Sequence, residues 1–139
     1  EKLIAAGADV NAMNKSGSTA LQWASISGEV AVVEMLIDAE ADVDAKDKDG
    51  WTALHCASSN GHDAVVEKLI AAGADVNAMN KSGSTALQWA SISGEVAVVE
   101  MLIDAEADVD AKDKDGWTAL HCASSNGHDA VVEKLIAAG

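Results

Sequence analysis

Several residue types are missing from this chain of 139 residues. It has no proline, phenylalanine or tyrosine, and all nine of its basic residues are lysines. Aromatic residues make up only 3% of the chain, although hydrophobic residues make up 49%. A core must therefore be built from Ala, Val, Leu and Ile, which suits closely packed helices. So narrow a composition is typical of repeated sequences.

Positive charge is also scarce, because nine basic residues face 23 acidic ones and give a formal net charge of −14. A field of this sign repels phosphate backbones and anionic lipid headgroups, so we expect no nucleic-acid partner. No apolar stretch approaches the roughly 18–20 residues of a membrane span, so we expect no membrane insertion. The opening EKLIAAGADV lacks the layout of a secretion signal and an initial methionine, so we expect a segment of a longer protein.

The sequence repeats itself with two periods. Residues 1–73 are identical to residues 67–139, which is a period of 66. Inside this block lies an imperfect period of 33, in which 19 of 33 paired positions match between residues 14–46 and residues 47–79. Repeats of this length indicate a solenoid of stacked supersecondary units.

Each 33-residue unit has the same expected secondary structure. A Gly-centred turn, KSGS or KDGW, precedes Thr19 or Thr52, which are good N-caps, and Thr19 with Gln22 fits a capping box. A first helix then runs to about Ser27 or Asn60, and a second helix carries VVEMLI or VVEKLI. The segment ADVNA or ADVDA extends toward the next turn. Isolated helices shorter than about 12–15 residues are marginal in water, so these units must stack.

The motifs of one unit match a known repeat. Residues 52–57 read TALHCA, and GH, VV, LI and GADVNA follow at the spacing of the ankyrin repeat. The chain thus resembles the ankyrin-repeat family over its whole length. The resemblance implies an all-α fold, an ankyrin-repeat solenoid of stacked helix-turn-helix units with projecting hairpin-like turns. It divides one domain, residues 1–139, into the end of a truncated repeat at 1–13, full repeats at 14–46, 47–79 and 80–112, and a truncated repeat at 113–139.

Departures from the family pattern bear on local structure. Ala53 stands where the family usually has proline, so entry into the helix is less rigidly set. By resemblance, His55 and His121 tie neighbouring turns together, whereas Gln22 stands at this position in the alternate units and must make any such hydrogen bond differently. Glu40 replaces the glycine after the second helix, which puts a left-handed helix end in doubt.

The sequence offers no convincing site for chemistry. The segment DKDGWTALH suggests a calcium loop, but with Gly50 at its sixth place, Ala45 and Cys56 stand where an EF-hand needs ligands. We interpret it as a turn and a helix start, and expect no metal and no cofactor. The four histidines lack zinc-ligand spacing, and no third group orients His55 against Cys56. We therefore expect no enzymatic activity and no small-molecule substrate.

Cysteine and asparagine positions bear on the cellular setting. Cys56 and Cys122 are equivalent residues two units apart, and a separation of ~20 Å is too long for a disulfide. Reduced core cysteines fit a cytoplasmic location, with an extracellular fibre as the alternative. Asn14 and Asn80 begin N-K-S sequons at finger tips, where a glycan would fit. Alternatively, each asparagine only takes the place of Asp47 as the first residue of the turn.

The resemblance also implies a partner-binding surface, because in this family the projecting turns and first helices line a concave face that contacts other proteins. Transferred position by position, the candidate residues are Lys15, Ser16, Ser18, Ile26, Ser27, Lys48, Asp49, Trp51, Ser59 and Asn60, with their equivalents Lys81, Ser82, Ser84, Ile92, Ser93, Lys114, Asp115, Trp117, Ser125 and Asn126. Trp51 and Trp117 are either interface anchors or packing against a neighbouring turn. Trp23 and Trp89 stand beside alanines of the first helix and are expected to fill the core.

Two functions remain open. The first is a non-enzymatic scaffold that binds a protein through the concave face. The alternative is a structural filament or spring-like fibre, natural or engineered, in which identical blocks assemble laterally or head to tail with other copies of the chain. Binding surfaces usually diversify between units, whereas identity at all 73 comparable positions suits a periodic partner or a periodic structure.

Overall fold

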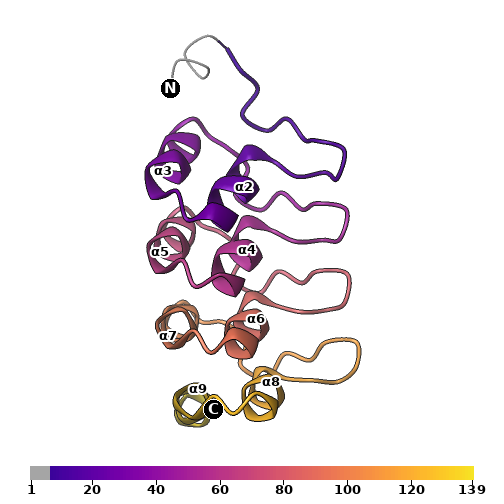
Figure 1. The fold of residues 1–139 in the computed structure, drawn as a ribbon, viewed down its shortest axis with the longest axis vertical. Coiled ribbons are helices and arrows are strands. Elements are labelled where there is room, and N and C mark those ends of the chain that lie inside the picture. The colour runs from indigo at the N-terminus through magenta and orange to yellow at the C-terminus, as the bar shows by residue number, and fades with distance from the viewer. Residues whose placement is uncertain (1–6) are drawn as a thin grey trace.

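The structure is a computed structural model and describes residues 7–139. These residues form eight helices and no strand. The inner helices are α2 (Ala20–Ser27), α4 (Ala53–Ser59), α6 (Ala86–Ser93) and α8 (Ala119–Ser125), and the outer helices are α3 (Val30–Asp38), α5 (Asp63–Ala71), α7 (Val96–Asp104) and α9 (Asp129–Ala138). Pairs of one inner and one outer helix stack in a column (Figure 1). The expected solenoid of helix-turn-helix units is therefore confirmed.

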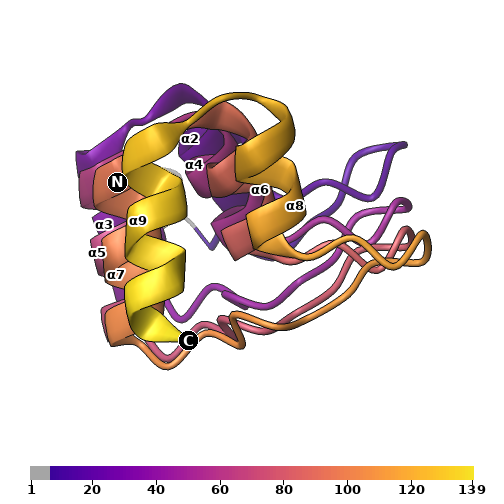
Figure 2. The same cartoon turned by 90° about the horizontal axis from the view of Figure 1, so that it is seen from below.

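The column has two long faces. The segments before each inner helix project to one side, and we call them fingers (Figure 1). Viewed along the column, the inner helices lie between the outer helices and the fingers (Figure 2). We call the surface made by the fingers and inner helices the inner face, and the surface made by the outer helices the outer face. We call residues 14–46, 47–79, 80–112 and 113–139 units 1 to 4.

The inner helices begin with the hydrogen bonds that the sequence predicts. The backbone N–H of Gln22 donates to Thr19 Oγ1 at 3.3 Å, and the Thr19 N–H donates to Gln22 Oε1 at 2.8 Å. Thr52 makes the same capping box with His55, whose Nδ1 accepts the Thr52 N–H at 3.1 Å. The histidine ring thus replaces the glutamine side chain in alternate units. Gly28 ends α2 at a φ of 74°, as expected for a left-handed cap.

The outer helices end in a left-handed residue even where that residue is not glycine. Gly73 has a φ of 89°, and Glu40 and Glu106 have φ values of 65° and 67°. The doubt about left-handed termination at Glu40 is therefore wrong. The Ala41 N–H still donates to the Leu36 carbonyl at 3.0 Å, so the helix-ending bond is kept at a backbone cost of about 1–2 kcal/mol.

The core is aliphatic and runs through the whole column. Leucines and valines between the two helix layers are almost fully buried, among them Leu21, Leu54, Leu69, Leu87, Leu102, Val33, Val65, Val66, Val98 and Val99. The expectation that tryptophan fills this core is wrong, because Trp23 is 53% exposed. Its equivalent Trp89 is half-buried, and its ring packs across the seam between units, 4.7 Å from the Trp51 ring centroid. No such ring lies against Trp23 among the described residues.

The seams between units are of two alternating kinds. Between units 1 and 2, Gln22 Nε2 donates to the Trp51 carbonyl at 2.9 Å. Between units 2 and 3, His55 Nε2 lies 3.0 Å from the Ser84 carbonyl. Because Nδ1 of His55 accepts the Thr52 N–H, the proton is on Nε2, which donates to Ser84. The two side chains make the same cross-unit bond, as expected, with different donors.

Candidate functional site

Each finger tip is a tight turn that a side chain closes. Asp47 Oδ1 accepts the N–H groups of Asp49 at 2.9 Å and of Trp51 at 3.0 Å. The Asp47 N–H donates in turn to the Trp51 carbonyl at 3.0 Å. Gly50 supplies the left-handed residue of this turn, with a φ of 81°. The Asp47 carboxylate is therefore engaged with the backbone of its own turn, as the turn interpretation requires.

The two sequon asparagines make the same turn. Asn80 Oδ1 accepts the N–H groups of Ser82 at 3.0 Å and Ser84 at 2.9 Å, and the Asn80 side chain is only 7% exposed. Asn14 repeats these bonds and is exposed. The geometry favours the turn-initiating role at Asn80, because a glycan there would have to displace its packing. At Asn14, the structure shows the same turn bonds on an accessible side chain.

Backbone hydrogen bonds join the finger tips into a row. The Lys48 N–H donates to the Ser16 carbonyl at 3.1 Å, and the Lys81 N–H donates to the Asp49 carbonyl at 3.0 Å. The same bond joins the fingers of units 3 and 4. The finger-tip lysines are all exposed: Lys15, Lys48, Lys81 and Lys114. The inner face therefore has a fixed edge and does not depend on independent flexible loops.

A hollow of about 360 Å³ lies on the inner face beside α4. It is lined by Ile26, Asp47, Asp49, Trp51, Cys56, Ser59 and Asn60. Five of these seven are residues that the sequence assigns to the partner-binding surface. Asp47 and Cys56 are the two that the sequence interpretation missed. Cys56 lies four positions before Asn60, one helical turn away, and this spacing is the signal that could have identified it.

Trp51 is one of the residues that line this hollow. Its ring centroid is 5.7 Å from that of His55 and 4.7 Å from that of Trp89 in the next unit. Trp51 thus packs against its neighbours, while part of its surface lines the hollow. Trp117, its equivalent in unit 4, is 41% exposed. Both sequence interpretations of Trp51 therefore describe part of its environment.

The remaining candidate residues differ in accessibility. The exposed ones are Lys15, Ser16, Ser27, Lys48, Asp49, Asn60, Lys81, Ser82, Ser93, Lys114, Asp115, Trp117, Ser125 and Asn126, and the half-buried ones are Ser18, Ile26, Trp51, Ser59 and Ile92. Ser84 is buried at 9% exposure, and its carbonyl accepts the His55 bond. Ser84 is therefore part of a seam and is poorly placed to contact a partner.

Burial governs the titration of the groups beneath this face. Burial lowers the pKa of His55, despite its bond to Ser84. Burial, reinforced by the charge of Asp47, raises the pKa of the Cys56 thiol to about 12. Cys56 and Cys122 are both free and buried, as expected. A protonated thiol is a poor nucleophile, so the Cys56 side chain is unreactive at neutral pH.

Two further properties of residues 7–139 bear on ligands. No group of three or more His, Cys, Asp or Glu side chains in this range is arranged to hold a metal ion. Within the same range, none of the helices has the length and apolarity that crossing a membrane requires.

Comparison with known proteins places the chain in a family. The family model for ankyrin repeats, which spans three repeat copies, matches residues 1–80 and 64–139. No curated protein matches the chain. Ankyrin repeats are generally scaffolds for protein–protein interaction and are typically not enzymes. With these matches and its stacked helix pairs, the chain belongs to the ankyrin-repeat family.

Proposed function

We propose that this chain is a non-enzymatic scaffold that binds a protein partner through its concave inner face. The supporting observation is the hollow beside α4, where Trp51 and Ile26 provide apolar surface and Asn60 provides polar groups. Aromatic anchors that are surrounded by polar groups are typical of interface hot spots. The fixed row of finger tips also lowers the entropic cost of binding.

The 66-residue period specifies the partner further. Ile92, Asp115, Trp117 and Asn126 recur at the same relative positions, two units along the column. A partner with two equivalent segments about 20 Å apart, at roughly 10 Å per helix layer, would engage both positions at once. We therefore infer a protein partner that is itself repetitive.

Selection of binders tests this proposal. Peptides selected from a random displayed library against the chain should protect backbone amides of the fingers and inner helices from hydrogen exchange. Trp51→Ala should weaken such binders at least about tenfold, as expected for an interface anchor. Glu133→Ala, on the outer helix α9, serves as the control and should leave affinity unchanged. Protection confined to the outer helices, or equal affinities for both variants, would contradict the proposal.

The free, buried cysteines also support an inference about location. Cys56 and Cys122 are both buried and not joined to each other, which suits a compartment with reducing conditions. We infer a cytoplasmic setting for the chain. Labelling of the intact cell with a membrane-impermeant biotin reagent should leave the chain unmodified, and modification would contradict this inference.

A second candidate function, head-to-tail assembly of copies into a filament, is supported by the seam between units 2 and 3. Unit 4 repeats unit 2, and unit 1 repeats unit 3, so unit 1 of a second copy could dock on unit 4 through this same seam. Leu120 is 40% exposed while its equivalent Leu54 is 1% exposed, and Val32 is 42% exposed while Val98 is 0% exposed. Residues 133–139 of the first copy have the same sequence as residues 1–7 of the second copy. The first copy would therefore supply this segment in the stack, in place of residues 1–7 of the second.

Light scattering over a concentration series tests this second candidate. The chain should form rods whose mass grows with concentration, because a head-to-tail contact does not close on itself. Leu120→Lys should abolish growth, since it places a charge in the docked seam. Ala97→Lys, at an exposed position of α7 in unit 3, introduces the same side chain away from both end units and should not. A constant monomer mass for the unmodified chain would end this candidate.

A further inference from the structure

The outer face carries an alternating pattern that binding at the inner face does not use. Glu34 and Glu100 occupy the same position in α3 and α7, and each faces a lysine from the next outer helix. Lys68 Nζ lies 3.7 Å from Glu34 Oε1, and Lys134 Nζ lies 3.3 Å from Glu100 Oε2. These two are the ion pairs within residues 7–139, and they close the α3–α5 and α7–α9 seams.

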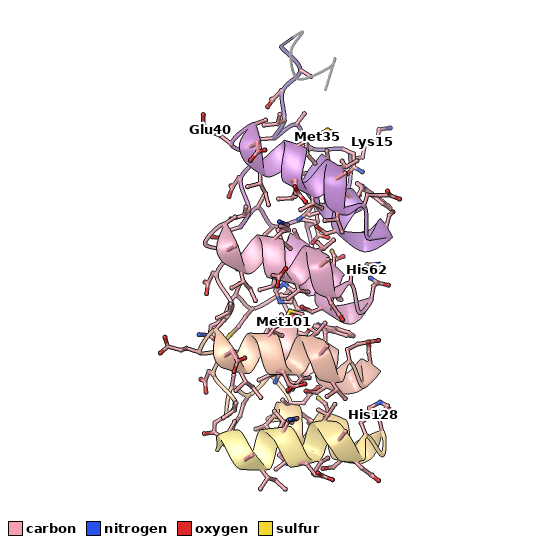
Figure 3. The ribbon with its side chains drawn as sticks, turned by 90° about the vertical axis from the view of Figure 1, so that its left-hand side faces the viewer. Lys15, Met35, Glu40, His62, Met101 and His128 are labelled. Carbon is pink, nitrogen blue, oxygen red and sulfur yellow. The ribbon has the colours of Figure 1, made fainter. Side chains whose placement is uncertain are left out.

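The α5–α7 seam lacks this pair. Glu67 occupies the glutamate position in α5, but Met101 stands in α7 where Lys68 and Lys134 stand in their helices. A groove of about 360 Å³ lies here, against about 230 Å³ beside the Glu34–Lys68 pair. Its lining residues are Glu67, Ile70, Ala71, Met101, Asp104 and Ala105. Met101 lies at this seam on the outer face (Figure 3).

The groove combines an apolar floor with acidic rims. Ile70 and Met101 are half-buried side chains, one from each helix, and methionine adapts its shape readily to a ligand. Glu67 and Asp104 are exposed carboxylates on opposite helices. Neither carboxylate is in an ion pair within the part of the chain that the structure describes. In the neighbouring seams, the equivalents of Glu67 each lie beside the ammonium group of a lysine.

We propose that this groove docks a lysine or arginine side chain from a basic, amphipathic segment of a partner protein. The methylene groups lie along Ile70 and Met101, and the charged end lies between Glu67 and Asp104. Charge complementarity selects this occupant, because the chain has a net charge of −14 and the groove holds two carboxylates without a cation. An acidic or purely apolar segment would leave both carboxylates uncompensated.

This docking is independent of the inner-face proposal, because the groove is lined by residues of α5 and α7 and of the segment directly after α7. These outer helices lie on the opposite side of the column from the fingers (Figure 2). A partner segment in the groove would leave the hollow beside α4 accessible. The Glu–Met combination recurs with the 66-residue period of the sequence, so longer arrays of this block would present the groove at every second seam.

A matched pair of substitutions tests the proposal. Met101→Lys places a lysine opposite Glu67, recreating the pair that Lys68 and Lys134 already make, and so fills the groove. Met35→Lys is the control, because Met35 is the same residue in α3 and carries the same charge change outside the groove. The probe is a fluorescent, amphipathic helical peptide of leucine and lysine, measured by anisotropy at about 0.15 M ionic strength.

Met101→Lys should weaken the peptide at least about tenfold, and Met35→Lys should change its affinity less than about twofold. Methyl NMR of the unmodified chain should show a shift at Met101 and not at Met13, Met35 or Met79, which requires no variant to fold. Equal weakening by both substitutions, or unchanged binding to Met101→Lys, would overturn the groove as a site. Trp51→Ala should bind the peptide normally, so failure here is distinguishable from failure of the inner-face proposal.

Discussion

Replacing Gly50 with alanine should destabilise the chain more than replacing Gly116, although the two glycines lie in identical sequences. Both have a φ of 81°, so alanine costs about 1 kcal/mol in each because of the left-handed backbone. A Cβ on Gly50 would lie 3.0 Å from Asn80 Cα and from Lys81 N of the next finger, whereas a Cβ on Gly116 would meet nothing within 4 Å. Backbone atoms cannot rotate away, so overpacking adds about 1–3 kcal/mol at Gly50 alone.

Urea denaturation followed by circular dichroism measures this difference. The free energy of unfolding should fall by about 1 kcal/mol in Gly116→Ala and by about 2–4 kcal/mol in Gly50→Ala. Tryptophan fluorescence should be recorded in parallel, because repeat arrays can unfold in parts and non-coincident transitions would invalidate the comparison. Equal losses in the two variants would refute the conclusion that the finger backbones are held in close, unyielding contact.

Four further outcomes are expected. Glu40→Gly should raise the free energy of unfolding by about 1 kcal/mol in urea, because glycine adopts the left-handed conformation without strain, and a loss would contradict this. His55→Gln should cost less than about 1 kcal/mol, since Gln22 makes the same cap and cross-unit bonds, whereas His55→Ala should cost about 2–4 kcal/mol. Because burial lowers the pKa of His55 from 6.5, the unfolded chain binds this proton first as the pH falls. Stability should therefore be constant above about pH 6.5 and decline below it, and urea midpoints should decline less steeply in His55→Gln. With a pKa of about 12, Cys56 should react with iodoacetamide far more slowly in the native chain than in urea, and rapid native labelling would disprove its burial.

The sequence predicts features that depend on neighbours within one helical turn. The Thr19–Gln22 box and the Gly28 cap are of this kind, because their partners lie within four residues in the chain. The left-handed φ of Glu40 goes against its residue type, and it accompanies the helix-ending bond from the Ala41 N–H to the Leu36 carbonyl. The repeat period and the capping residues therefore predict the helix pairs. The strained backbone at Glu40 could be found only in the structure.

Contacts across seams could be predicted only in part. The candidate surface positions recur with the repeat, and five of them do gather in one hollow. Trp51 and Trp89 are 38 positions apart, which is not a multiple of 33, so the period alone does not align their rings. Ser84 was included although a seam covers it, and the Met101 groove was missed, because both depend on how one helix lies against the next.

Because two kinds of seam alternate along the column, a change in the number of units keeps these seams only when it involves an even number of units. Loss of one 33-residue unit such as residues 80–112 would bring Lys134 to the place of Met101, opposite Glu67, and erase the outer groove. The joint between units 1 and 2 would stay, but a joint of a new kind would replace the other two. Loss or gain of 66 residues would leave every remaining joint as it was. Recombination between such genes would thus preserve the protein's surfaces only when it adds or removes repeats two at a time.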